Sequence, residues 1–157
     1  MNVAIFPGSF DPITNGHLDI IEKASGTFDK IIVAVSYNSN KKSFLPIKTR
    51  IDLIKKSVIN YNNVEVDSFE GLTVNYAKLK NSKILIRGLR NTIDFEYEQQ
   101  LANINKSLNP DIETIFFLTK PEYSSVSSSV VKEVYLNNGN FSFFVPSAVD
   151  EYLKNQK

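Results

Sequence analysis

The sequence has 157 residues, 42% hydrophobic and 22% charged, a composition typical of one soluble domain with a hydrophobic core. Its 18 basic and 17 acidic side chains give a net charge of +1, so long-range electrostatics favour neither nucleic acid nor an anionic membrane as a partner. Because cysteine is absent, disulfides, thiolate zinc sites and a cysteine nucleophile are excluded.

Five short apolar runs, rich in β-branched residues, predict β-strands. They cover residues 3–6, 31–35, 64–66, 84–86 and 115–118. The first run follows Met1 with no basic leader and no long hydrophobic segment, so we expect no membrane span and a cytoplasmic location.

Helical periodicity separates these runs. It is clearest in two apolar sets, Ile47, Ile51, Ile54 and Val58, and Tyr97, Leu101, Ile104 and Leu108. Residues 146–157 predict a last helix that Pro146 opens, with Val149 and Leu153 on its inner face.

Alternating strands and helices favour an α/β fold of the doubly wound, Rossmann-like type, formed by residues 1–157 as a single domain. We expect a five-stranded parallel sheet with helices on both faces, because right-handed crossovers place helices above and below it. Ligands of such sheets bind beyond the carboxyl ends of the strands, so the loops after the strands are the candidate site.

The turn-rich segment after the first strand, residues 7–17, leads into a helix expected to begin near Gly16. Free amides and the helix dipole at such an N-terminus favour anions, and Ser9 and His17 would face a bound phosphate there. The alternative is that Gly8 and Gly16 only shape turns and that His17 is a partly exposed residue at the helix start.

Basic side chains follow two other strands. Arg87 and Arg90 share the loop after the fourth strand, where each guanidinium can hold phosphate oxygens bidentately. Lys41 and Lys42 follow the second strand and could reach the same crevice, although a lysine pair in a polar loop is more often a solvated surface.

A serine cluster, residues 124–129, is interrupted only by Val126 and leads directly into the helical pattern of residues 130–135. A helix N-cap would account for one of these serines and leave the others unexplained, so we favour phosphate binding. Since neither G-x-x-x-x-G-K-[ST] nor G-x-G-x-x-G occurs, the sequence predicts a nucleotide site of another kind.

The segment P-G-S-F-D-P-I-T-N-G-H resembles the T/H-x-G-H signature of the nucleotidyltransferase superfamily. The strings I-R-G-L-R, D-F-E-Y-E-Q-Q-L-A-N-I-N and S-S-S-V-V-K-E-V follow in that order, and the chain is similar nearly end to end to bacterial phosphopantetheine adenylyltransferases. The resemblance implies that ATP and 4'-phosphopantetheine give dephospho-coenzyme A and pyrophosphate. It also implies Mg²⁺ as cofactor, a homohexamer and coenzyme A as feedback inhibitor.

The resemblance also assigns site residues. Contacts with ATP fall to Ser9, Phe10, His17, Gly88, Leu89, Arg90, Glu98, Tyr123, Ser124, Ser125, Val126, Ser127, Ser128 and Ser129. Contacts with 4'-phosphopantetheine fall to Ser9, Lys41, Thr73 and Arg87, and no protein side chain is assigned to the metal. Some members have threonine where this chain has Ser9, and the hydroxyl is retained in either case.

The acceptor phosphate is already an anionic nucleophile, so in-line attack on the α-phosphorus needs no general base and no covalent enzyme intermediate. The catalytic set is then expected to be His17, Lys41 and Ser9 around the α-phosphate, with Arg90 and residues 127–129 on the β- and γ-phosphates and Arg87 on the acceptor. An unperturbed His17 would titrate near a pKa of ~6.5, and a bound phosphate would raise that value.

Three alternatives remain at this stage. One is a related transferase that uses nicotinate mononucleotide or, with CTP, a polyol phosphate; the strings I-R-G-L-R and E-Y-E-Q-Q-L speak against it. The second is a nucleotide-binding module without turnover, and the third is an electron-transfer protein of flavodoxin type.

Overall fold

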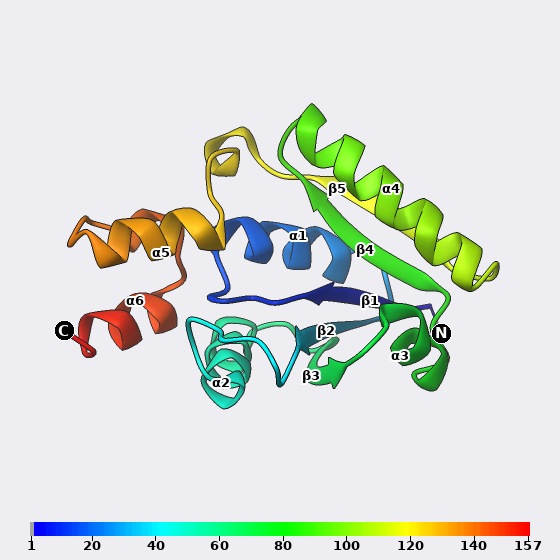
Figure 1. Cartoon of the computed structure of the whole chain (residues 1–157), viewed down its shortest axis with the longest axis horizontal. Helices are drawn as coiled ribbons and strands as arrows, with labels where there is room; N and C mark the ends of the chain where they lie inside the picture. Colours follow the sequence, from blue (N-terminus) through cyan, green and yellow to red (C-terminus); the bar gives the residue numbers. More distant parts are fainter. Residues whose placement is uncertain (1) are drawn as a thin grey trace.

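The computed structural model of the chain describes residues 2–157 and contains a five-stranded parallel sheet. Its strands are β1 (Val3–Gly8), β2 (Lys30–Tyr37), β3 (Val64–Glu70), β4 (Ile84–Leu89) and β5 (Glu113–Leu118). They lie in the order β3-β2-β1-β4-β5 (Figure 1). The predicted doubly wound α/β fold is therefore confirmed, with the third strand continuing beyond residue 66 to Glu70.

Six α-helices connect and follow the strands. They are α1 (Asn15–Ser25), α2 (Ile47–Ser57), α3 (Thr73–Leu79), α4 (Thr92–Leu108), α5 (Ser128–Leu136) and α6 (Ser147–Lys154), with the 3₁₀ turns η1 (Pro121–Tyr123) and η2 (Ser142–Phe144). The sequence pattern missed α3, because seven residues are too few for a helical period to stand out. None of the helices formed by residues 2–157 combines the length and the apolar character needed to span a bilayer.

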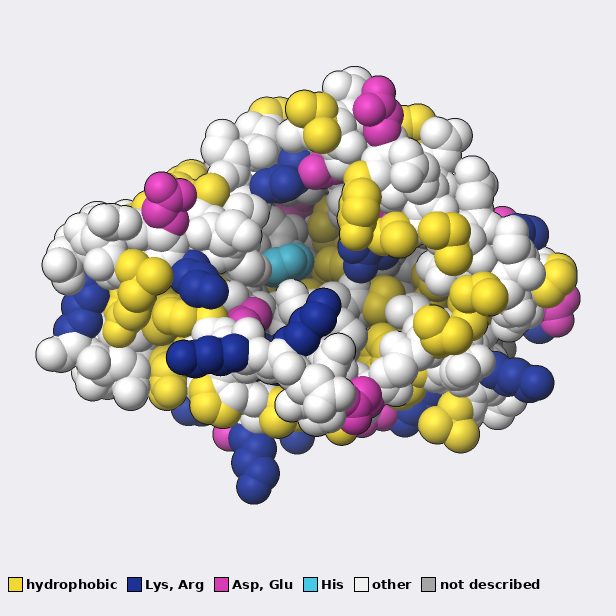
Figure 2. Space-filling view, viewed as in Figure 1, with side chains coloured by type: hydrophobic (Ala, Val, Ile, Leu, Met, Phe, Trp, Pro, Cys, Tyr) yellow, Lys and Arg dark blue, Asp and Glu magenta, His cyan; other side chains and the backbone are white. Residues whose placement is uncertain are grey.

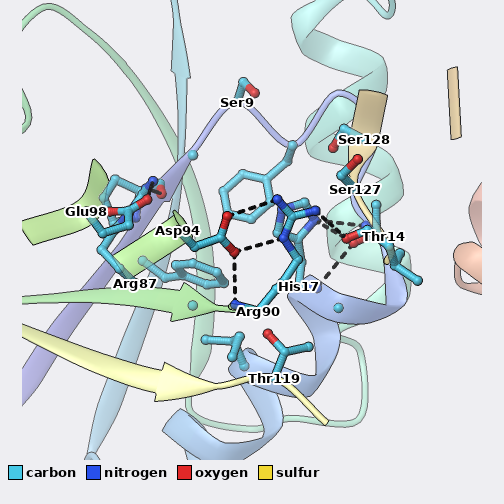
Figure 3. A pocket seen from close by; sticks show the side chains of 18 residues that line it. Ser9, Thr14, His17, Arg87, Arg90, Asp94, Glu98, Thr119, Ser127 and Ser128 are labelled. Atoms are coloured by element: carbon cyan, nitrogen blue, oxygen red, sulfur yellow. Dashed lines mark hydrogen bonds and ion pairs between the residues drawn. The ribbon is translucent and has the colours of Figure 1, made fainter. Parts of the chain in front are cut away.

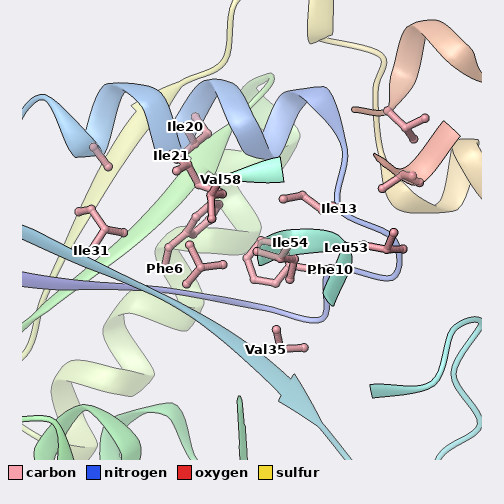
Figure 4. Close-up of a cluster of buried hydrophobic side chains, with 14 of the residues drawn as sticks. Phe6, Phe10, Ile13, Ile20, Ile21, Ile31, Val35, Leu53, Ile54 and Val58 are labelled. Carbon is pink, nitrogen blue, oxygen red and sulfur yellow. The ribbon is translucent and has the colours of Figure 1, made fainter. Parts of the chain in front are cut away.

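Alternate side chains of the central strands β1, β2 and β4 enter two separate hydrophobic cores. Ala4 and Phe6 of β1 pack with α1, α2, α5 and α6, and Figure 4 shows part of this cluster around Phe6 and Ile54. Ile5, between them in the sequence, points to the other face and packs with residues of α3. This alternation is the period of two expected for strands covered on both faces.

The apolar face predicted for α4 is largely exposed to solvent. Tyr97, Ile104 and Leu108 keep 61%, 54% and 54% of their surface accessible, whereas Glu98 of the same helix is 7% exposed. The helix was predicted in its place, but of its apolar stripe only Leu101 is half-buried, in a cavity wall with Leu85 and Thr114 of the sheet. The buried side chain of α4 is instead the carboxylate of Glu98.

The sheet opens between β1 and β4. β1 pairs with β2 from Val3 to Gly8, but with β4 only at Ala4 and Ile5. Beyond Ile5 the two neighbouring strands diverge at their carboxyl ends, and this is also where the order of the strands reverses. Both properties mark the ligand crevice of an open α/β sheet.

Candidate active site

A cavity of about 260 Å³ lies at this opening, and Figure 2 shows the single histidine, in cyan, at the bottom of the hollow. It is walled by the ends of β1 and β4, the start of α1 and the start of α5 (Figure 3). We call it the first cavity; its lining is Phe6, Pro7, Gly8, Ser9, Phe10, Thr14, Gly16, His17, Ile20, Arg87, Gly88, Arg90, Asp94, Glu98, Thr119, Val126, Ser127 and Ser128.

His17 is oriented by Thr14, the N-cap of α1. The Thr14 backbone N–H donates to Nδ1 of His17 at 3.0 Å, and the His17 backbone N–H donates to Oγ1 of Thr14 at 3.3 Å. This reciprocal capping box makes Nδ1 an acceptor, so the neutral imidazole carries its proton on Nε2. The ring can therefore donate one hydrogen bond from Nε2.

The environment also keeps His17 neutral. Burial of the ring, reinforced by the positive charges of Arg87 and Arg90, lowers the pKa of His17 from 6.5 to about 4. The value near 6.5 expected for an unperturbed His17 does not apply, because burial and the two arginine neighbours, neither visible in the sequence, perturb the ring. At neutral pH the imidazole is a hydrogen-bond donor without a charge.

Arg87 spans the gap between the diverging strands. Its Nη1 donates to the carbonyl of Pro7 at 2.6 Å, while Nε and Nη2 donate to the two carboxylate oxygens of Glu98 at 2.7 and 2.6 Å. Glu98, predicted to contact ATP, is thus the ion-pair partner of Arg87, and the pair joins β4 to α4 at the cavity wall. All three guanidinium nitrogens of Arg87 are engaged.

Arg90 is paired in the same way with Asp94. Nε and Nη2 of Arg90 donate to the Asp94 carboxylate at 2.9 and 3.0 Å, and Nη1 approaches the Val126 carbonyl at 3.4 Å. The hydrogen bond from Arg90 lowers the pKa of Asp94 below its ordinary value. Asp94 and Glu98 lie four residues apart on one face of α4. Asp94 pairs with Arg90 in the loop after β4, whereas Glu98 pairs with Arg87, which lies within β4 and not in the loop as predicted.

The serine cluster divides between cavity wall and surface. Val126, Ser127 and Ser128 line the cavity, while Tyr123, Ser124, Ser125 and Ser129 are not part of its wall in this structure. Ser127 is the N-cap of α5 and accepts from the Val130 backbone N–H at 3.1 Å. Ser128 donates its hydroxyl to the Pro12 carbonyl at 2.7 Å, which ties the start of α5 to the loop after β1.

A second cavity, of about 490 Å³, adjoins the first and shares Ser9 with it. It contains Lys41 and Lys42, so Lys41 lies beside the first cavity rather than in it. Asp11 holds the loop that carries the two lysines, because its carboxylate accepts the backbone N–H groups of Phe44 and Leu45, both at 2.7 Å.

Thr73 lines a third, smaller cavity of about 160 Å³. Arg87, Glu98, Pro7 and Gly8 form part of this wall as well as of the first cavity. The four residues predicted to contact the acceptor therefore surround the first cavity from two sides. Ser9 and Lys41 meet at the second cavity, and Arg87 and Thr73 meet at the third.

Several residues of the site were not singled out from the sequence. Asp94 could have been found, since it follows Arg90 by four residues at a helix start. Thr119 directly follows β5 and enters the wall of the first cavity. Arg50 gave no signal, because it sits within the helical pattern of residues 47–58 and its burial depends on the loop folded over it. Leu89, assigned to ATP, is buried and not in the cavity wall.

Gly88 is required by the close approach of α1 to β4. A Cβ atom at this position would lie 2.8 Å from Cγ1 of Ile20, closer than such contacts occur. The missing side chain lets α1 bring His17 beside the two arginines.

Charge is unequally distributed over the site. In the first cavity the two arginines are each neutralised by a carboxylate and the histidine is uncharged. In the second cavity Lys41, Lys42 and Arg50 face one carboxylate, Asp11. The second cavity therefore has the larger excess of basic over acidic side chains in its wall.

The parallel sheet thus has a crevice at its strand reversal, and the sequence Thr14-x-Gly16-His17 stands at its first helix. The cytidylyltransferase-like family matches residues 5–134 of the chain. A putative nicotinate-nucleotide adenylyltransferase from Vibrio parahaemolyticus has the same fold, with a TM-score of 0.69, 16% sequence identity and coverage of 99% of this chain and 100% of the other.

Curated relatives are much more similar in sequence. Phosphopantetheine adenylyltransferase of Vesicomyosocius okutanii is 51% identical over 98% of this chain and 98% of its own. That of Carboxydothermus hydrogenoformans is 52% identical over 98% of this chain and 95% of its own. The chain belongs to the phosphopantetheine adenylyltransferase family and is an enzyme.

Proposed function

We propose that this enzyme transfers the adenylyl group of ATP to 4'-phosphopantetheine, giving dephospho-coenzyme A and pyrophosphate in coenzyme A biosynthesis. The observation that carries the proposal is that Ser9 lines both the first and the second cavity. Two anionic substrates bound on either side of Ser9 would meet at its hydroxyl, next to His17. The names of the relatives supply the identity of the acceptor.

The chemistry is a direct in-line displacement. An oxygen of the acceptor phosphate bonds to the α-phosphorus of ATP, while the bond from that phosphorus to the α,β-bridging oxygen breaks and its electron pair leaves with pyrophosphate. No proton has to be removed from the nucleophile, which agrees with a neutral His17 that has its Nδ1 occupied by Thr14. His17 acts as a donor from Nε2 to the α-phosphate, where charge develops.

Arg87, near the end of β4, and Arg90, in the loop after it, would each contribute through their position. Arg90 lies beside Ser127 and Ser128 on the wall of the first cavity, where β- and γ-phosphates would reach the N-terminus of α5. The phosphates would compete with Asp94 for Arg90. Arg87, assigned to the acceptor phosphate, would approach it from the wall that it shares with Pro7 and Glu98.

Magnesium is proposed to enter with ATP. Asp94 and Glu98, the carboxylates of the first cavity, are each ion-paired with an arginine, so this donor set suits a Mg²⁺ held chiefly by phosphate oxygens and water. When bound, the ion would offset repulsion between the two polyanions.

We also propose a cytoplasmic homohexamer regulated by coenzyme A. The exposed apolar residues of α4, among them Tyr97, Ile104 and Leu108, support self-association, because monomers seldom leave such a stripe open to water. Light scattering on the wild type and on Ile104→Lys tests the assembly. A monomeric wild type would contradict the hexamer without touching the proposed reaction.

Pyrophosphate release by the purified enzyme tests the function. ATP and Mg²⁺ are supplied with 4'-phosphopantetheine, nicotinate mononucleotide or glycerol 3-phosphate, and the series is repeated with CTP. Release only with ATP and 4'-phosphopantetheine is the expected result. Release with another pair would replace the acceptor, and absence of release with every pair, despite ATP binding, would indicate a binding module.

A further inference from the structure

Arg50 is a buried arginine without a role in the reaction described so far. It lies on α2 with only 5% of its surface exposed and lines the second cavity with Ser9, Lys41 and Lys42. Its Nη1 donates to the Ser9 carbonyl at 2.9 Å and approaches the Ser36 carbonyl at 3.5 Å. The side chain therefore joins the loop after β1 to the end of β2.

The charge of Arg50 has no acidic counterpart in the protein. Arg87 and Arg90 each form an ion pair, whereas no carboxylate oxygen of residues 2–157 lies within 4.0 Å of the Arg50 guanidinium. Its Nε is buried and has no hydrogen-bond partner. A buried charge in this state is costly unless further partners stabilise it, and two backbone carbonyls do so only in part.

The surroundings of Arg50 favour an anion as the missing partner. Lys41 and Lys42 add positive charge to the same cavity. Asp11 is the acidic side chain of this wall, but both of its carboxylate oxygens already accept backbone N–H groups. The second cavity thus combines three cations with one carboxylate whose hydrogen-bonding capacity is partly used.

We propose that Arg50 binds the phosphate monoester of the acceptor in the second cavity. The inference rests on the proposed function for the identity of that acceptor. Nη1 already donates to the Ser9 carbonyl and Nε is buried, so Nη2 is the nitrogen left to donate to a phosphate oxygen. Because Nη1 grips the Ser9 carbonyl, the same guanidinium places the acceptor phosphate next to the residue shared by both cavities.

Arg87, which the resemblance assigns to the acceptor, is already paired within the protein. Its three nitrogens are occupied by Glu98 and Pro7, so it would have to break existing hydrogen bonds to bind a phosphate. Arg50 needs no such exchange. Among the arginines of the site it is the one with an unsatisfied charge.

The test compares Arg50→Gln and Arg50→Lys with Lys55→Gln, which removes a positive charge from an exposed position of the same helix. Arg50→Gln should raise KM for 4'-phosphopantetheine about tenfold or more, the effect of losing one charge-assisted interaction. KM for ATP should change far less. Arg50→Lys should recover part of the loss, and Lys55→Gln should resemble the wild type.

A structural role alone would give a different pattern. It would lower the thermal midpoint and the active fraction while leaving both KM values unchanged, and that result, or a parallel rise of both KM values, would overturn the proposal. If Arg50→Gln does not fold, the same comparison on Arg50→Lys decides. Lysine keeps the charge but lacks the planar guanidinium, whose two terminal nitrogens contact the Ser9 carbonyl and the phosphate separately.

Calorimetric titration without nucleotide separates this inference from the proposed function. The probes are inorganic phosphate, 4'-phosphopantetheine and pantetheine, which lacks the phosphate. The wild type should bind inorganic phosphate and 4'-phosphopantetheine, and should bind pantetheine more weakly than 4'-phosphopantetheine. The Arg50 variants should lose this difference in affinity. Equal phosphate binding by wild type and variants would reject the site, whereas loss of binding supports it even if the wild type releases no pyrophosphate with any acceptor.

Discussion

Arg87 and Glu98 form a two-pronged ion pair at the point where β1 and β4 separate. The donors Nε and Nη2 reach Oε2 and Oε1 at 2.7 and 2.6 Å, and Nη1 holds the Pro7 carbonyl of the neighbouring strand at 2.6 Å. One side chain therefore connects β4, β1 and α4. It joins β1 and β4 beyond the point where their pairing ends, at Ile5.

Replacing Glu98 by glutamine should destabilise the protein and impair turnover. The amide keeps one acceptor for Arg87 but leaves its charge uncompensated at the cavity wall. We expect a loss of about 2 kcal/mol in the free energy of unfolding, below the 3–5 kcal/mol typical of fully buried pairs because Arg87 is partly exposed. Urea unfolding measures it, with the exposed Glu96→Gln on the same helix as control; equal stability of the two variants would contradict this role.

His17→Ala should fold normally and lose at least about 10²-fold in kcat, the usual effect of removing one preorganised donor. The alanine variant retains Thr14 as N-cap, so the start of α1 keeps its cap residue. Circular dichroism checks the fold and pyrophosphate release checks the rate. A variant with near-normal turnover would remove His17 from the catalytic set.

The lowered pKa of His17 predicts a pH dependence of stability. Below a pH of about 6.5 the unfolded chain binds a proton on this histidine, whereas the native imidazole stays neutral until about pH 4. Because the unfolded state binds more protons in this window, stability should fall as pH falls through it, by up to about 3 kcal/mol from this group.

Comparison of wild type with His17→Asn isolates that contribution, since other titrating groups are common to both proteins. The unfolding free energy of the wild type minus that of His17→Asn, both measured in urea, should decrease from pH 7 towards pH 4. A difference independent of pH would show that the histidine titrates alike in the native and unfolded states.

Gly88→Ala should destabilise the protein by about 1–3 kcal/mol through overpacking. The added methyl would meet Ile20 at 2.8 Å, whereas the control Gly26→Ala would place its methyl 3.7 Å from the nearest atom. In an Ile20→Ala background the cost of Gly88→Ala should become smaller, as a double-mutant cycle would reveal. Strict additivity of the two substitutions would refute the contact.

Much of the fold was predictable because its signals are local. Five β-branched runs separated by helical periods specify a parallel sheet, and strand ends in such a sheet share one edge. Ser9, His17, Arg87 and Arg90 could therefore be placed together before any coordinates. The short helix α3 was missed, and the apolar face of α4 was found in the sequence although Tyr97, Ile104 and Leu108 remain largely exposed.

The sequence alone predicted the α/β architecture and the loops proposed to bind anions, and it carried the resemblance to adenylyltransferases, because each depends on residues close together in the chain. Tertiary structure alone decided how the charges are paired. Glu98 neutralises Arg87, Asp94 neutralises Arg90, and Arg50 is buried without a carboxylate. Burial and distance govern pKa values and electrostatic compensation, and neither can be read from the order of the residues.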